Sequence, residues 1–222
     1  MTRGAFIVVE GVDRCGKTSQ TMKLVESLQQ KNIKAERMAF PDRTTWTGQV
    51  ISNYLADKNC KLNDQAIHLL FTANRWENVE KMKEKLSSGI TLVVDRYFYS
   101  GVAFSAAKGM SIDWCLQPEI GLLKPDKVLF LRIKSDTQKS RPGFGEERYE
   151  TSVMQQKVNK IYDKFSQSED NWKIIDANSS FDEVHEDLLN NIVESVQNVA
   201  NSNAPFKYLL NHCNKEDYTK NV

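Results

Sequence analysis

The sequence predicts an α/β fold in which helices cover both faces of a five-stranded parallel sheet and a mobile lid follows the fourth strand. Short runs of apolar, β-branched residues alternate along the chain with longer segments of helical period, a pattern typical of parallel sheets. The strand candidates at 5–10 and 91–95 are almost continuously apolar, as strands covered on both faces are. A glycine-rich turn joins the first strand candidate to the first helix.

Composition describes an ordinary globular chain. It has 222 residues, 30 Lys and Arg, 29 Asp and Glu, a net charge of +1 and a pI near 7.6. This balance gives no electrostatic reason to expect a nucleic-acid or membrane partner. The apolar fraction of 40% argues against disorder, and no stretch is long enough to span a bilayer. Four cysteines without metal spacing favour reduced thiols and a cytoplasmic location, with a nuclear or organellar one left open.

The first half of the chain contains three strand candidates. Residues 5–10 (AFIVVE) form a buried strand, and the turn at 11–18 leads into a helix that ends near residue 31. Residues 34–38 form a weaker strand, which the Phe-Pro-Asp-Arg break at 40–43 ends. Residues 45–57 are helical, and residues 63–87 form one long helix whose apolar stripe is interrupted at Asn74. Gly89 caps it before the strand 91–95 (TLVVD).

The second half completes the sheet. Residues 97–108 are helical, and residues 127–132 (KVLFLR) form the fourth strand. The polar segment at about 135–150 is expected to be the mobile lid, followed by a helix over 151–168 and a fifth strand over 172–176. The last helix carries apolar residues at helical spacing from 181 to 199. We therefore expect one domain over 1–200 and a poorly ordered C-terminal tail over 201–222, in which Phe206-Lys-Tyr-Leu-Leu is the one segment with the composition to dock on the domain.

The strongest motif is Gly11-Val12-Asp13-Arg14-Cys15-Gly16-Lys17-Thr18, which matches the phosphate-loop pattern G-x-x-x-x-G-K-[ST]. Its glycines let backbone N–H groups point at phosphate oxygens, and the following helix adds the positive end of its dipole. Lys17 is expected to reach the β- and γ-phosphates, and Thr18 to bind Mg²⁺. A strand before the loop and a helix after it favour a fold of the P-loop NTPase type over a chance match.

The rest of the chain favours a small phosphoryl-transfer kinase. The base-recognition motif and switch motif of GTPases are absent from the sequence. Asp95 ends the strand 91–95, where a carboxylate holds the Mg²⁺ shell directly or through water, although a helix N-cap would also explain it. Arg96 follows at the same sheet edge, where it is able to bind a phosphate or simply form a surface ion pair.

Five segments together resemble thymidylate kinase in its eukaryotic and poxviral form. They are Gly-Val-Asp-Arg-x-Gly-Lys-Thr (11–18), Phe-Pro-Asp-Arg (40–43), Leu-Leu-Phe-Thr-Ala-Asn-Arg-Trp-Glu (69–77), Asp-Arg-Tyr-x-x-Ser-Gly-Val-Ala-Phe (95–104) and Phe-Gly-Glu-Glu-Arg-Tyr-Glu (144–150). The resemblance covers roughly residues 4–200. It implies transfer of the γ-phosphoryl group of ATP to dTMP, a step in dTTP synthesis, with Mg²⁺ as cofactor and a homodimer as the assembly.

The resemblance also assigns the acceptor site. Phe71 and Arg75 lie four apart on one helix face and would hold thymine, although Phe71 on the apolar stripe is also explained by core packing. Arg43 and Arg96 would bind the 5′-phosphate, and Asp13 would accept a hydrogen bond from the sugar 3′-hydroxyl. The remaining residues implied to bind dTMP are Phe40, Ser100, Phe104 and Tyr149.

The donor site and the catalytic residues follow from the loop and the lid. The residues expected to bind the ATP phosphates are Asp13, Arg14, Cys15, Gly16, Lys17 and Thr18, and the expected catalytic residues are Arg14, Lys17, Asp95, Arg96 and Arg141. Members of the family carry the catalytic arginine either in the loop or in the lid, and Arg14 resembles the loop type. Because Arg141 and Arg148 also lie in the lid, the division of labour stays open.

Two other functions compete with this reading. A deoxynucleoside kinase also combines a phosphate loop with arginines, but it needs a carboxylate base for a neutral hydroxyl, for which Asp42 or Glu36 would have to serve. The second alternative is a scaffold protein that binds nucleotides without turnover. The intact Lys17 and Thr18 argue against it. The expected partners are the small molecules ATP and dTMP and a second copy of the chain, with no nucleic acid and no membrane.

Overall fold

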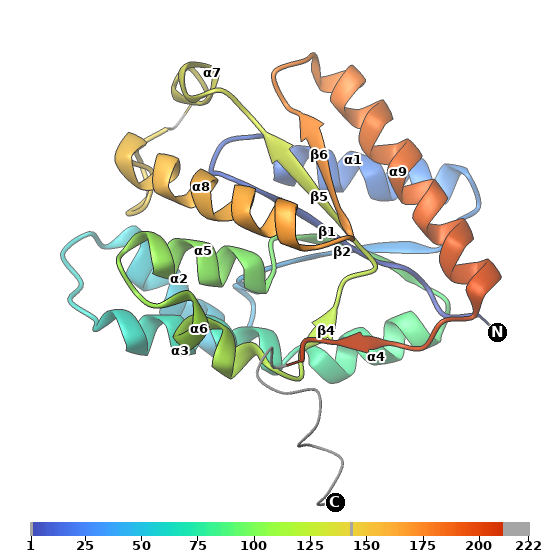
Figure 1. Ribbon diagram of the computed structural model, residues 1–222, viewed down its shortest axis with the longest axis horizontal. Coiled ribbons are helices and arrows are strands. Elements are labelled where there is room, and N and C mark those ends of the chain that lie inside the picture. Colours follow the sequence, from blue (N-terminus) through green and yellow to red (C-terminus); the bar gives the residue numbers. More distant parts are fainter. Residues whose placement is uncertain (1, 143, 211–222) are drawn as a thin grey trace, which may run out of the picture.

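The computed structural model describes residues 2–142 and 144–210 (Figure 1). Five parallel strands form the main sheet in the order β2-β3-β1-β5-β6. They are β1 (Phe6–Gly11), β2 (Ala35–Ala39), β3 (Thr91–Asp95), β5 (Lys127–Arg132) and β6 (Trp172–Asp176). The five predicted strands and their parallel arrangement are confirmed.

Burial along the strands follows their place in the sheet. Every residue of β1 and β3 is buried, because both strands lie inside the sheet with neighbours on each side. The edge strands β2 and β6 expose part of their residues. Their mixed composition explains why β2 is the weaker strand in the sequence.

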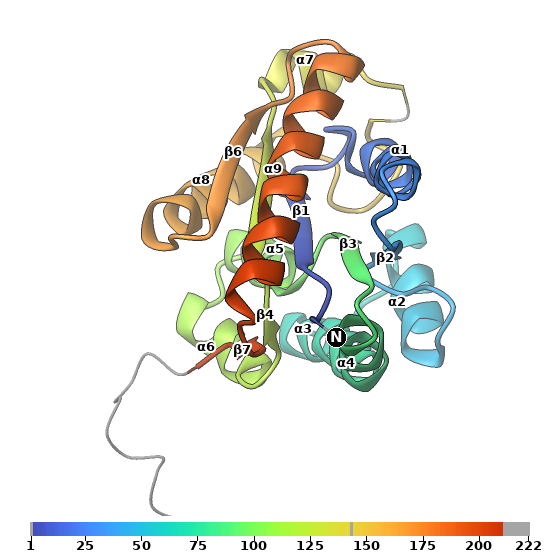
Figure 2. The ribbon, with the colours of Figure 1, turned by 90° about the vertical axis from the view of Figure 1, so that its right-hand side faces the viewer.

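Helices cover both faces of the sheet (Figures 1 and 2). On one face lie α1 (Lys17–Gln30) and α9 (Phe181–Ser202), and on the other lie α5 (Phe98–Ala107) and α8 (Ser152–Ser168). The helix α2 (Trp46–Ala56) packs on α3 (Asp64–Trp76), and α3 packs on α5. The main hydrophobic cluster runs from Ala5 to Leu209 through all five strands of the sheet.

The expected single helix over 63–87 is two helices. The first, α3, ends at Trp76, and α4 spans Val79–Ser87. The side chain of buried Asn78 donates to the Asn74 carbonyl (3.0 Å), while the Asn78 backbone N–H donates to Arg75 O (3.1 Å). An asparagine amide that occupies the i−4 carbonyl competes with the helical ladder, so the prediction of one helix was wrong here.

Asn74, the interruption in the apolar stripe, has a structural role. Its Oδ1 accepts from the Asp42 N–H (2.7 Å), and its Nδ2 donates to the Asp42 carbonyl (3.1 Å). The same Nδ2 donates to Thr45 Oγ1 (2.9 Å). A polar residue in the stripe therefore fixes the loop that carries Phe40 and Arg43.

Several short elements have no signal in the periodicity. They are α6 (Ile112–Leu116), the 3₁₀ turn η1 (Gln117–Glu119), β4 (Leu123–Lys124), α7 (Ser135–Lys139) and β7 (Lys207–Tyr208). The helix α7 occupies the start of the segment expected to be the lid. No helix among residues 2–142 and 144–210 is long and apolar enough to cross a membrane.

The beginning of the expected tail is ordered. Residues 201–202 complete α9, and β7 pairs antiparallel with β4. Leu209 is buried, its N–H donates to Leu122 O (2.8 Å), and its carbonyl accepts from the Gly121 N–H (2.9 Å). The prediction of a tail with little structure is wrong for residues 201–210, because backbone pairing and one apolar anchor hold them. Residues 211–222 of that tail lie outside the described residues.

Leu209→Ala tests this docked segment, called here the C-terminal strap (residues 203–210). Removing a buried leucine side chain should cost about 2 kcal/mol of unfolding free energy, the low end for buried leucines, because the strap is at the chain end. Urea unfolding measures this. The neighbouring Leu210, which is 74% exposed, gives the control, and Leu210→Ala should cost less than about 0.5 kcal/mol. Equal effects of the two changes would show that the strap is not docked in solution.

Candidate active site

The loop between β1 and α1 has the geometry of an anion site. Arg14 (φ 59°) and Gly16 (φ 99°) adopt the left-handed conformation, which curls the backbone before α1 begins at Lys17. No side chain caps the start of α1, so its first N–H groups remain available for an anion. Gly11 is needed for space, because a Cβ there would lie 2.8 Å from the Leu131 carbonyl oxygen. The phosphate-loop motif thus has the shape that the sequence predicts.

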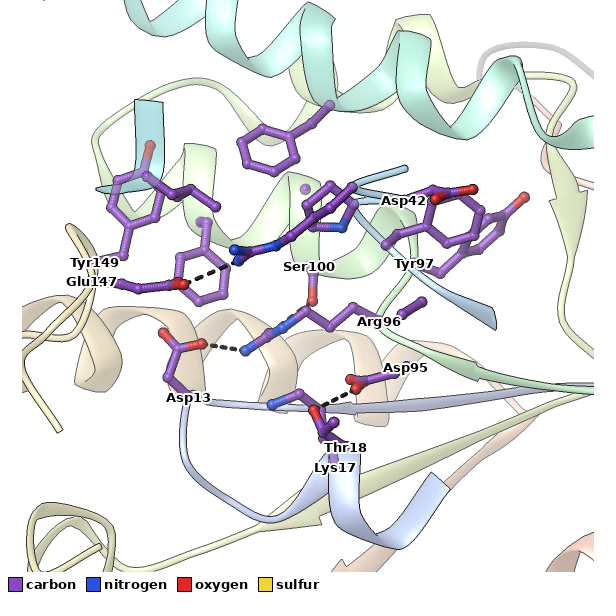
Figure 3. A pocket seen from close by; sticks show the side chains of 18 of the residues that line it. Asp13, Lys17, Thr18, Asp42, Asp95, Arg96, Tyr97, Ser100, Glu147 and Tyr149 are labelled. Carbon is purple, nitrogen blue, oxygen red and sulfur yellow. Dashed lines mark hydrogen bonds and ion pairs between the residues drawn. The ribbon is translucent and has the colours of Figure 1, made fainter. Parts of the chain in front are cut away.

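The loop lies at one end of a cavity of about 990 Å³ that runs along the carboxyl ends of the strands (Figure 3). Of the predicted site residues, all of which the structure describes, only Cys15 is not part of its lining. The Cys15 thiol is buried and accepts from Lys17 Nζ (3.5 Å), as fits a small loop filler. Lys17 Nζ also donates to the Val12 carbonyl (2.7 Å), which holds the ammonium group inside the loop.

Thr18 and Asp95, the two residues predicted to hold Mg²⁺, are hydrogen-bonded to each other. Thr18 Oγ1 donates to Asp95 Oδ2 (2.7 Å), and Arg37 Nη2 forms an ion pair with the same oxygen (3.1 Å). Asp95 is not the N-cap of α5, because the N-cap position is Tyr97, so that alternative is wrong. Mg²⁺ commonly takes one or two protein oxygens and completes its shell with substrate phosphates and water. A hydroxyl and a carboxylate beside the phosphate loop fit that donor set.

Arg96 lies at the centre of the cavity floor (Figure 3). Its Nη2 forms an ion pair with Asp13, and its Nη1 donates to the Gly11 carbonyl (3.0 Å) and to Ser100 Oγ (3.1 Å). Burial lowers the pKa of Arg96, but Asp13 and the other nearby acidic groups outweigh burial and leave this pKa raised. The guanidinium is therefore a fixed positive charge between the loop and α5.

Asp13 is held from both sides. Its Oδ2 accepts from Gln155 Nε2 (2.6 Å), and its backbone N–H donates to Gln155 Oε1 (2.9 Å). A carboxylate oxygen has two lone pairs, so Asp13 still has room for the hydrogen bond from a sugar hydroxyl that the resemblance implies. Gln155 on α8 was missed, because nothing in the sequence links a helix glutamine to a loop 142 residues earlier.

A buried carboxylate lies beneath Arg96. Glu10, at the end of β1, accepts from the backbone N–H groups of Tyr97 (2.9 Å) and Ser100 (3.2 Å), and so satisfies the start of α5. It also accepts from Ser100 Oγ (2.6 Å) and Tyr162 OH (3.0 Å). Burial raises the pKa of Glu10 above its ordinary value of 4.5, although these donors and Arg96 act against the rise. A charged residue at the end of an otherwise apolar run was the signal for it.

Two further arginines of the cavity pair with the lid. Arg14 Nε forms an ion pair with Glu150 Oε1 (2.7 Å), and its Nη2 pairs with Glu146 Oε2 (3.2 Å). Arg43 Nη2 pairs with Glu147 Oε1 (3.0 Å), and this pair is half-exposed. Glu150 in turn accepts from the backbone N–H groups of residues 145, 146 and 147, which shapes the lid turn.

The two lid arginines differ in position. Arg141 lines the cavity, and its catalytic role stays a prediction. Arg148 instead turns toward α2, where it donates to the carbonyls of Tyr54 (3.1 Å) and Cys60 (2.8 Å) and stacks over the Tyr54 ring (4.1 Å). Arg148 therefore attaches the lid to α2 and does not face the cavity.

The other end of the cavity is aromatic and includes one buried arginine. Phe71, Phe104 and Tyr149 line it, and Phe71 and Tyr149 also pack on the small hydrophobic cluster of Ile51, Tyr54, Leu55 and Ile67. Phe71 therefore lines the cavity and packs against this cluster at once, while its role in holding thymine stays a prediction. Arg75 lines the cavity too, although it is only 2% exposed.

Arg75 has a partner that the sequence did not reveal. Its Nε donates to Glu119 Oε2 (2.9 Å), and its Nη2 forms an ion pair with Glu119 Oε1. Glu119 lies on η1, is fully buried and is not among the residues that line the cavity. Without the fold, no spacing connects it with a helix 44 residues earlier.

Comparison with known proteins gives one consistent result. The family model for thymidylate kinase matches residues 9–188. The chain is 53% identical to the thymidylate kinase of Danio rerio over 188 residues, which cover 84% of this chain and 88% of that protein. It is 50% identical to the thymidylate kinase of Homo sapiens over 188 residues, with the same coverage of 84% and 88%. The solved structure of thymidylate kinase from Candida albicans superposes with a TM-score of 0.83 at 34% identity, and the match covers 94% of this chain and 99% of that one.

Glu10→Gln tests the buried carboxylate through pH. In the folded protein the pKa of Glu10 is raised above 4.5, so the folded state binds the proton more tightly than the unfolded chain does. The contribution of Glu10 to stability is therefore full below pH 4.5 and is lost as pH rises through the raised pKa. Urea unfolding across this range should show the wild type losing stability relative to Glu10→Gln, which does not titrate there. If the wild type instead gains stability relative to Glu10→Gln as pH rises, the hydrogen-bond donors and Arg96 outweigh burial and the pKa of Glu10 is not raised.

Proposed function

The chain belongs to the thymidylate kinase family, and we propose that it transfers the γ-phosphoryl group of ATP to dTMP, yielding dTDP and ADP. It is thus a nucleoside-monophosphate kinase. The observation that carries the proposal is that one continuous cavity has the phosphate loop at one end and Phe71 and Arg75 at the other. Its volume of about 990 Å³ is at the upper end of ligand sites, in keeping with two nucleotides.

The chemistry needs charge neutralisation more than proton transfer. The acceptor phosphate is already an anion, so no side chain has to act as a base. Lys17, at the first position of α1, neutralises charge on the donor phosphates, and Arg96 holds the acceptor phosphate close to them. Arg43, whose pair with Glu147 is exposed, is able to exchange that carboxylate for the acceptor phosphate at little cost.

Thr18 and Asp95 are the residues that would hold Mg²⁺ beside the donor phosphates, directly or through water. When bound, this ion neutralises phosphate charge and orients the transferring group. Arg37, which pairs with the same Asp95 oxygen, orients that carboxylate toward Thr18.

The role of Arg14 requires a change of partner. In the structure Arg14 pairs with Glu150 and Glu146 of the lid, and its Nη1 donates to the Pro142 carbonyl (3.3 Å). We propose that it gives up the exposed Glu146 contact for the transferring phosphoryl group and keeps Glu150 as its anchor. Arg141 then contributes charge from the lid side as a secondary group.

The nucleoside-kinase alternative has little support. Of its two candidate bases, Glu36 pairs with Lys85 and is not among the residues that line the cavity. Asp42 lines the cavity, but its Oδ1 accepts from the N–H and the hydroxyl of Thr44 (3.1 and 2.6 Å). Arg43 beside it favours an acceptor that carries a phosphate.

We also propose a homodimer that uses α3 and α6. Leu69 and Trp76 on α3 and Trp114 on α6 are 45%, 41% and 39% exposed, and large apolar side chains that gather on one surface mark an interaction site. Trp114 lies beside α3, with its ring centroid 5.6 Å from that of His68. Family resemblance implies a dimer, and this apolar surface is the one it would bury.

We also propose a cytoplasmic location. Cys15, Cys60 and Cys115 are free thiols, and Cys15 and Cys115 are buried. Free buried thiols are typical of a reducing compartment.

A panel of acceptors tests the function. ADP formation from ATP should be fastest with dTMP. For dUMP, kcat/KM should be lower by a factor of about 10–200, which corresponds to about 1–3 kcal/mol, the usual value of one methyl group. Purine monophosphates should be poor acceptors, because an aromatic slot for one pyrimidine ring has no room for them. Comparable kcat/KM for dGMP or AMP would refute the proposal. If thymidine is a better acceptor than dTMP, the protein is a nucleoside kinase. If it binds nucleotides but releases no ADP, it is a nucleotide-binding scaffold.

Arg14→Gly tests the loop arginine. Glycine suits the left-handed backbone there (φ 59°), so the loop should keep its shape while the charge is lost. An arginine that stabilises the transferring group is worth about 10³–10⁵ in kcat. We expect a fall of that order for Arg14→Gly, a smaller one for Arg141→Ala, and none for Arg132→Ala, whose partner Asp163 lies on the surface. If Arg141→Ala loses the rate and Arg14→Gly keeps it, the catalytic arginine is in the lid.

A further inference from the structure

We propose that Glu119 is the positioning residue for Arg75, and that it thereby makes the site select a pyrimidine with a carbonyl at position 4 over one with an amino group. In nucleotide terms the site accepts dTMP and rejects dCMP. The proposal rests on the proposed function, since it concerns how the acceptor base is recognised. It adds a residue outside the cavity to the specificity of the site.

The contact between Glu119 and Arg75 fixes the guanidinium at two points. Both carboxylate oxygens are used, one by Arg75 Nε (2.9 Å) and the other by Arg75 Nη2. Thr72 Oγ1 adds a third contact by donating to Glu119 Oε1 (2.7 Å). A planar guanidinium held by two of its nitrogens cannot rotate about its long side chain.

The remaining edge of the guanidinium is the one available to a ligand. Glu119 occupies the Nε and Nη2 side, and Nη2 also donates to Thr72 Oγ1 (3.3 Å). Within residues 2–142 and 144–210, Nη1 has no hydrogen-bond acceptor. Gly101 on α5 gives the group its space, because a Cβ there would lie 2.7 Å from Nη2 and 3.1 Å from Nη1. Arg75 lines the cavity, so its free donors are directed at whatever ring lies between Phe71 and α5.

Burial of the Arg75–Glu119 ion pair carries a desolvation cost, which argues against a purely structural role for the pair. Arg75 is 2% exposed and Glu119 is fully buried, and such a pair often contributes no more stability than two apolar side chains of the same size. A buried ion pair with one edge open to a ligand cavity is explained when that edge recognises the ligand. The carboxylate then compensates the charge that recognition needs.

Glu119 itself is held from several sides. Trp76 Nε1 donates to the carbonyl of Pro118 (2.8 Å), and the Gly121 that follows η1 packs so closely that a Cβ there would lie 3.1 Å from the Trp76 ring. The C-terminal strap then pairs with residues 121 and 122. The carboxylate is therefore fixed in position before any ligand binds.

The chemistry of the bound edge gives the selectivity. A guanidinium has hydrogen-bond donors and no acceptor. The carbonyl oxygen at position 4 of thymine or uracil accepts from it, whereas the amino group of cytosine places a donor against a donor. Because the guanidinium cannot turn away, the donor–donor mismatch with cytosine is not relieved. The fixed arginine therefore disfavours cytosine as well as favouring thymine.

Steady-state kinetics with dTMP and dCMP tests the proposal on the full chain. Wild type is measured first, and failure to phosphorylate dTMP there would refute the proposed function independently of Glu119. In Glu119→Gln we expect KM for dTMP to rise at least about tenfold, and the ratio of kcat/KM for dTMP over dCMP to fall by a similar factor, because Arg75 is released from its fixed orientation. KM for ATP should stay within about twofold, since the donor end of the cavity is untouched.

Two further variants make the result decisive. Glu169→Gln is the matched control, because Glu169 pairs with Lys124 (2.6 Å) away from the cavity, and its dTMP over dCMP ratio should equal that of wild type. Glu119→Asp keeps the buried charge, so it should fold even if Glu119→Gln does not, and its shorter side chain should lower the same ratio by a smaller factor. An unchanged ratio in the folded Glu119 variants, or an equal loss of kcat for both acceptors with KM unchanged, would overturn the proposal and leave Glu119 a structural role only.

Discussion

The parallel pairing of β1 with β3 is the constraint on which the site depends. Val9 lies opposite Asp95, so the two strands end at the same sheet edge. The Arg96 N–H donates to the Val9 carbonyl (3.0 Å), and Arg96 then leaves the sheet in the left-handed conformation (φ 67°). This turn directs its side chain back over the loop, where Asp13 receives it. The phosphate loop, Asp95 and Arg96 thus become neighbours although more than seventy residues separate them in sequence.

Carboxylates from other elements control the arginines of the cavity. Arg75 with Glu119 is buried, Arg96 with Asp13 is 18% and 19% exposed, and Arg43 with Glu147 is 52% and 41% exposed. Breaking a buried pair leaves an uncompensated charge, whereas an exposed pair contributes little. Under the proposed function, this gradient separates a fixed base-recognition end from an acceptor-phosphate end where Arg43 is able to exchange its partner. The lid glutamates Glu146, Glu147 and Glu150 neutralise Arg14 and Arg43 in this structure, and in the proposed mechanism phosphates take over part of that role.

The sequence predicts the elements whose signals are local. Short apolar runs identified the strands of the main sheet, with β2 the weakest of these signals because its composition is mixed, and the phosphate loop identified the fold type and one end of the cavity. What it missed depends on contacts between distant residues. The break between α3 and α4 results from one asparagine side chain, and the order of residues 201–210 depends on a docking site that exists only after folding. Glu10, Gln155 and Glu119 were recognised only from the structure, because each contacts a residue far away in the sequence.

A crystal structure with dTMP, Mg²⁺ and a non-hydrolysable ATP analogue is the most direct test of this division of the cavity. It should show thymine between Phe71 and Arg75 with the Arg75–Glu119 pair intact, and the donor phosphates on the loop. Arg43 should have left Glu147 for the acceptor phosphate. A thymine ring bound elsewhere, or an Arg75 that leaves Glu119 to reach it, would contradict a fixed base-recognition end.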